Sequence, residues 1–117
     1  MEFASSMGDL YEKARATTAA TDAARRRLLQ AVVREAGVPQ AIVEEGPQAI
    51  AKALRGRLGG DWTTVGLHLE KANDAAKESP TYREALAISR ALSEDAERIR
   101  AAARSGRGRD ARAMRVA

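Results

Sequence analysis

The side chains that could do chemistry in this 117-residue chain are few, and most lie between residues 46 and 76. One histidine, His68, and no cysteine leave little for nucleophile–base catalysis or for a metal site. The adjacent carboxylates at 44–45 and at 94–95 would diverge by about 100° on a helix, so they would not converge on a substrate. We therefore expect neither an enzyme nor a protein that holds a cofactor or metal.

The residues that could contact a nucleic acid follow a Gly-Gly-Asp turn at residues 59–61. Thr64, His68 and Lys71 stand at i, i+4 and i+7, so they would line one face of a helix that begins near residue 62. Hydroxyl and imidazole groups can contact base edges, and lysine or arginine can contact phosphates. This pattern predicts a helix that enters the major groove of double-stranded DNA. The candidate contact residues of this segment are Thr63, Thr64, His68, Lys71, Arg55 and Arg57.

An all-α chain is expected to position these residues. Alanine is abundant while aromatic and β-branched residues are scarce, which favours helix over sheet. We expect a small bundle of four to five helices, in which the segments at 48–58 and 62–78 form a helix-turn-helix-like pair. The apolar periodicity predicts helices at about 9–20, 23–36, 48–58, 62–78 and 81–104, and a short helix or turn at 39–45.

Local signals mark the ends and inner faces of these helices. Threonines at 17, 18 and 21 suggest a break near 21–22, and Gly37 suits a left-handed helix end. Asp61 should cap the helix after the turn by accepting from the backbone N–H of Thr63 or Thr64. Trp62 fits a core anchor with a bonded indole N–H. The second helix of the pair should bury Val65, Leu69, Ala72 and Ala76, in a stripe that Trp62 and Leu67 widen.

The net charge of +4 is unevenly placed along the chain. From residue 104 onward there are five arginines and one aspartate, so the remainder sums to zero. We expect a helical domain at 1–104 and a flexible, disordered basic tail at 105–117. Arg107 and Arg109, in an Arg-Gly-Arg sequence, could lie in a narrow minor groove, although a solubilising end has the same composition.

A thin, alanine-rich core should gain stability from association. The segment 82–104 keeps a heptad-like apolar spacing, so we expect a homodimer whose contact residues are Tyr82, Leu86, Leu92 and Ile99. No apolar run approaches the roughly 20 residues of a membrane span. The N-terminal residues lack the pattern of a secretory signal. We expect a cytoplasmic protein with no membrane contact.

The sixteen residues from Leu54 to Leu69, LRGRLGGDWTTVGLHL, resemble the amino-terminal DNA-binding segment of KfrA-type plasmid regulators. The shared features are an arginine-bearing helix that ends in Leu-Gly, a glycine turn, a Thr-Val pair and a later His-Leu pair. The resemblance implies a sequence-specific DNA-binding repressor of plasmid or mobile-element type. The alternative is a helical protein-interaction module with no nucleic-acid role, such as an adaptor, a chaperone, a secreted effector or a phage-type inhibitor.

Overall fold

The computed structural model describes the backbone of residues 2–78 and 80–116 and the side chains of residues 15–78 and 80–106. Within this part of the chain every regular element is a helix and there is no strand. The all-α class and the expected number of helices are thus confirmed. The helices are α1 (Glu2–Arg34), α2 (Gln40–Glu45), α3 (Pro47–Leu58), α4 (Thr63–Lys77) and α5 (Tyr82–Val116).

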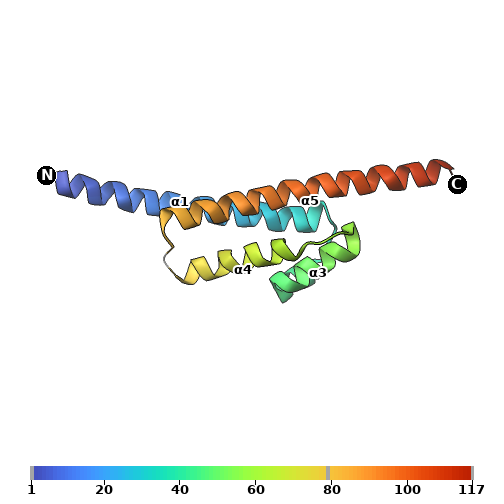
Figure 1. The fold of residues 1–117 in the computed structure, drawn as a ribbon, viewed down its shortest axis with the longest axis horizontal. Helices are drawn as coiled ribbons and strands as arrows, with labels where there is room; N and C mark the ends of the chain where they lie inside the picture. Colours follow the sequence, from blue (N-terminus) through green and yellow to red (C-terminus); the bar gives the residue numbers. More distant parts are fainter. Residues whose placement is uncertain (1, 79, 117) are drawn as a thin grey trace.

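The two long helices, α1 and α5, lie side by side and run in the same direction (Figure 1). Helix α4 returns in the opposite direction along this pair, and α3 packs against α4 (Figure 1). Parallel neighbours cannot be joined by a tight turn, so the chain between α1 and α5 must cross back over their length. Helices α2, α3 and α4 make that crossing.

Helix α1 is continuous, and the predicted break near residue 21 is wrong. The Thr21 hydroxyl donates to the carbonyl of Thr17 at 3.0 Å, and its oxygen lies 2.8 Å from Ser89 Oγ on α5. Because this hydroxyl is bonded within its own helix and to a neighbouring helix, it does not cap a new helix, and α1 continues through Thr21. The helix ends at Arg34, before Gly37, which has the expected positive φ of 72°.

Glycines form both turns around α3. Gly46, at φ 115°, separates α2 from α3, and Pro47 occupies the first position of α3, where its missing N–H costs no helical bond. Gly59 and Gly60 have φ values of 73° and 81°, in a region that a side chain would disfavour. These two residues turn the chain between α3 and α4, and Asp61 follows them as the predicted capping residue.

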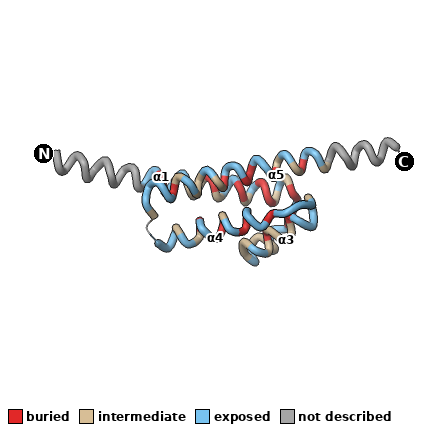
Figure 2. Tube along the Cα trace, viewed as in Figure 1, coloured by how far each residue is buried: buried red, intermediate tan, exposed pale blue. Residues whose placement is uncertain are grey.

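The core lies where α1, α3, α4 and α5 meet (Figure 2). The predicted inner face of α4 is confirmed by the burial of Val65, Leu69 and Ala72, which pack with Ile50 and Leu54 of α3. Two predictions for α4 are wrong, because Ala76 is exposed and Leu67 is 50 % exposed. The buried stripe of α4 is therefore narrower than its apolar residues suggested.

Two of the four proposed dimer-contact residues lie inside this chain. Leu92 and Ile99 are fully buried in the core, because the apolar face of α5 packs on α1 and α4. In this fold they present no surface to a second copy. Tyr82 is 57 % exposed and Leu86 is half-buried, and the dimer itself stays a prediction.

Ser105 and Gly106 continue α5, and the division into a helical domain and a disordered tail stays a prediction. Arg107 and Arg109 fall outside the side chains that the structure describes. Nowhere in the described residues does a helix have both the length and the apolar character needed to cross a bilayer.

Candidate nucleic-acid interface

Helix α4 begins on a rigid corner built around Trp62. The indole is 3 % exposed, and its N–H donates to the carbonyl of Gly59 at 2.7 Å, which confirms the predicted core anchor. The guanidinium of Arg98, on α5, lies 4.1 Å from the ring centroid and donates to the Asp61 carbonyl at 2.7 Å. Sequence reasoning missed Arg98, because nothing local links it to Asp61, 37 residues earlier.

Asp61 caps the first turn of α4 as predicted. Its Oδ1 accepts from the Thr63 backbone N–H at 2.9 Å and from the Thr63 hydroxyl at 2.6 Å. These two bonds, the hydroxyl first, hold the pKa of the Asp61 carboxyl below its ordinary value, and the charges of Arg55 and Arg98 add to this. The hydroxyl proton of Thr63 is thus already donated to the Asp61 carboxylate, whose negative charge lies beside it.

His68 does not share the open face of α4. Its Nδ1 lies 2.6 Å from Asp95 Oδ2 on α5, with the side chains 29 % and 8 % exposed. Burial raises the pKa of Asp95, while the bond and charge of His68 act in the opposite direction. The predicted row of Thr64, His68 and Lys71 is therefore divided, because α5 packs on the flank that carries His68.

The open face of α4 consists of exposed side chains spaced three or four residues apart. It runs along the helix from the turn, with small hydroxyls first, then an apolar residue, then two opposite charges. Its members are Thr63, Thr64, Leu67, Lys71 and Asp74. A face with one lysine and one aspartate is close to neutral, so most of the positive charge of this region must come from α3.

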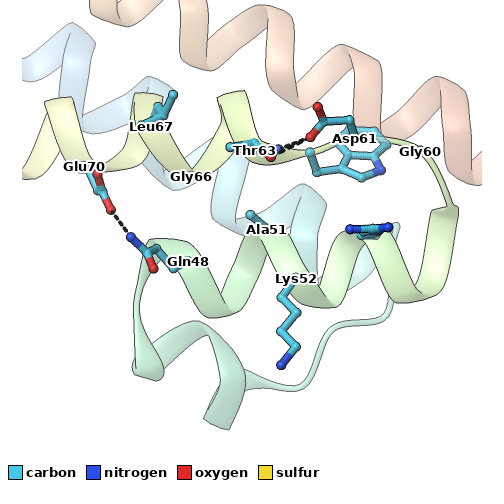
Figure 3. Close-up of a pocket in the computed structure, with 11 residues that line it drawn as sticks. Gln48, Ala51, Lys52, Gly60, Asp61, Thr63, Gly66, Leu67 and Glu70 are labelled. Atoms are coloured by element: carbon cyan, nitrogen blue, oxygen red, sulfur yellow. Dashed lines mark hydrogen bonds between the residues drawn. The ribbon is translucent and has the colours of Figure 1, made fainter.

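An open hollow of about 770 Å³ lies between α3 and α4 (Figure 3). Lys52 and Arg55 of α3 line one side, and Leu67 of α4 lines the other. The amide of Gln48 donates to Glu70 Oε1 at 3.3 Å across the hollow. The lining therefore holds two cations of α3 and two carboxylates, those of Asp61 and Glu70, so its formal charges balance.

The helices approach closely at Gly66. A Cβ at this position would lie 3.2 Å from the Pro47 carbonyl oxygen and 3.3 Å from Ala51 Cβ. Gly66 thus allows α4 to pack on the first two turns of α3. This close approach sets how α3 and α4 present their outer residues together.

Arg57 lies on a different side of α3 from Arg55. A Cβ added at Gly37 would lie 3.4 Å from Nη1 of Arg57, so this guanidinium lies beside Gly37. Arg57 therefore lies beside the connection that follows α1, whereas Arg55 lines the hollow. The two arginines predicted to contact phosphates together do not share one surface.

Within the described residues no group of three histidine, cysteine or acidic side chains could hold a metal ion. The chain matches no family model, no curated protein and no solved structure.

Proposed function

We propose that the protein binds double-stranded DNA, with α3 and α4 acting as a helix-turn-helix pair and α4 entering the major groove. The observation that supports this most is the open face of α4. In the first two turns of α4 this face carries the exposed side chains of Thr64 and Leu67, while α3 and α5 pack on the other sides of the helix. Such an exposed N-terminal segment, packed on a preceding helix, is the arrangement that reads base edges in helix-turn-helix proteins.

Helix α3 supports the proposal through its charge. It contains three basic residues and no acidic residue. Two of them, Lys52 and Arg55, are exposed beside the open face of α4. In this arrangement they contact phosphates flanking the groove, together with Lys71. His68 then serves as a positioning residue that holds α4 against Asp95, and Arg57 has no part in the interface.

The acidic residues near this surface limit the affinity. Glu70 has an amide partner, and Asp61 is engaged by Thr63, but Asp74 is exposed on the open face itself. With three cations facing phosphates, we expect the logarithm of the binding constant to fall with the logarithm of salt at a slope of about −3 for one protomer. A surface with this charge balance binds weakly without a matching base sequence.

The test is a fluorescence-anisotropy titration of the full chain against a pool of random duplexes, followed by selection of bound sequences. Arg55→Gln should weaken binding and lower the salt slope by about one unit. Arg57→Gln is the matched control, since it removes the same charge from the same helix on another side, and it should change neither quantity. Equal effects of the two substitutions, or no duplex bound at low salt, would contradict the proposal.

A second candidate is a helical protein-interaction module. The observation in its favour is the half-exposed Leu67 beside a hollow whose rim carries both signs of charge. A protein segment with an apolar anchor fits such a rim as well as a duplex does. Binding of that kind depends on apolar burial, so it would be nearly indifferent to salt.

A further inference from the structure

Arg98, on α5, holds the two residues that immediately precede α4. Its Nη2 donates to the Asp61 carbonyl at 2.7 Å, and the centre of its guanidinium lies 4.1 Å from the centroid of the Trp62 ring. The same ring is also tied to the turn, since the indole N–H donates to the Gly59 carbonyl at 2.7 Å. The backbone that leads into α4 is therefore fastened to α5 by a planar group that stacks and donates at once.

The turn itself is conformationally permissive. Gly59 and Gly60 have positive φ values of 73° and 81°, and glycine has access to more backbone conformations than any other residue. A Cβ at either position would meet nothing within 4 Å, so little packing restrains these two residues. The direction in which α4 leaves the turn therefore depends on the next two residues, Asp61 and Trp62, and Arg98 contacts both.

These contacts act on a part of α4 that core packing does not reach. Thr63 and Thr64, the first two residues of the helix, are exposed, and burial within the helix begins at Val65. The bond of His68 to α5 lies a further turn along. The start of α4 is therefore held by the corner before it, through the cap on Thr63 and the contacts of Arg98.

The charge of Arg98 is balanced within the fold. The carboxylates of Asp61 and Asp95 both interact with it electrostatically. The hollow between α3 and α4 is lined by Lys52 and Arg55, and not by Arg98. Although its side chain is exposed, Arg98 should therefore contribute little to the attraction of phosphates.

We infer that Arg98 is a positioning residue for the recognition of base sequence by α4. This inference rests on the proposed DNA binding. By holding Asp61 and Trp62, Arg98 fixes the first turn of the helix, so that Thr64 meets base edges in one orientation. It acts through α4 and contacts no phosphate. Its loss should therefore lower the preference for a matching duplex and leave the affinity for DNA in general unchanged.

The experiment separates base recognition from phosphate contact. Fluorescence anisotropy measures binding of the full chain to the selected duplex and to a duplex of scrambled sequence, each at several salt concentrations. Arg98→Gln should weaken binding to the selected duplex about tenfold, because binding must then restore the order that a hydrogen bond from a charged group supplied. Binding to the scrambled duplex should stay within about twofold of the wild type, with the same salt slope.

Arg100→Gln is the matched control, since it removes the same charge from α5 at a residue whose guanidinium donates to Glu97 at 2.6 Å. It should change neither the preference nor the salt slope. Arg98→Lys keeps the charge but cannot lie flat on the ring while it donates, so it should lose part of the preference. Amide hydrogen exchange in residues 63–66 should become faster in Arg98→Gln and not in Arg100→Gln.

The outcomes distinguish the inference from the proposed function. A salt slope lowered by about one unit in Arg98→Gln would reveal a direct phosphate contact and overturn the positioning role. An equal loss for the selected and scrambled duplexes, or an equal effect of Arg100→Gln, would overturn it as well, while DNA binding stands. If the wild-type chain binds no duplex at low salt, the proposed function fails first. Circular dichroism would check that each variant is folded.

Discussion

Replacing Gly66 with alanine tests the contact that joins α3 to α4. Alanine is favoured over glycine inside a helix by about 0.8–1 kcal/mol. At Gly66 the added methyl group would also meet the Pro47 carbonyl oxygen at 3.2 Å and Ala51 Cβ at 3.3 Å. Both are atoms held by the backbone of α3, so the helices must separate slightly. Overfilling of this kind typically lowers stability by about 1–3 kcal/mol.

Gly56 provides the matched control, because it is also helical and a Cβ there would meet nothing within 4 Å. Gly56→Ala should stabilise the protein by up to about 1 kcal/mol. Gly66→Ala should fall below that variant by about 1–3 kcal/mol. The loss of glycine flexibility in the unfolded chain is common to both variants, so it cancels in the difference.

Urea unfolding, followed by helix content and by the fluorescence of Trp62, would measure the two free energies of unfolding. The slopes of the transitions should agree with the wild type, so that midpoints report stability. Equal stabilisation by the two substitutions would refute the close approach of α3 and α4. It would also remove the geometric basis for treating their outer faces as one surface.

Two further predictions concern contacts made by α5 and the cap of α4. Thr21→Val should destabilise the protein by about 1 kcal/mol, since it removes the bond to Ser89, and a coupled loss in the double variant with Ser89→Ala would check this by urea unfolding. Asp61 and Asp95, whose ordinary pKa is 3.8, should change the free energy of unfolding in opposite directions as the pH varies in the acidic range, which urea unfolding at several pH values would measure. The lowered pKa of Asp61 makes its contribution present above that value and lost as the pH falls, so the wild type should lose its advantage over Asp61→Asn in acid. The raised pKa of Asp95 acts oppositely, so the stability of Asp95→Asn relative to the wild type should increase as the pH rises above 3.8.

The parts of the fold that the sequence predicted correctly depend on signals within a few residues. The Asp61 carboxylate accepts from a backbone N–H two residues away, and the N–H groups of Gly46 and Gly59 donate to carbonyls three and four residues earlier. The burial of Trp62 depends on one bond to a carbonyl three residues earlier. Such signals are visible in a sequence because the atoms that satisfy them are fixed by local geometry.

The parts that could not be predicted depend on pairing between distant segments. An apolar stripe on α5 shows that the helix must pack on something, but not whether the partner is α1 or a second copy. The periodicity alone therefore assigns Leu92 and Ile99 to a dimer, although both are buried in this chain's own core. Thr21 alone predicts a helix start, because the bond that ties it to α5 is made with Ser89, 68 residues away. The apolar character of Leu67 predicts burial, but the neighbours of α4 decide how wide its buried face is, and they leave Leu67 half exposed.

The same long-range contacts decide which part of α4 is available to a partner. Asp95 and Arg98 stand three residues apart on α5, so they share a face, and both reach the beginning of α4. One holds His68, and the other holds the carbonyl of Asp61 and the ring of Trp62. These contacts turn the imidazole inward and leave the flank with Leu67 open. Helix α5 therefore acts on the candidate interface indirectly, by fixing the rotation of α4 about its own axis.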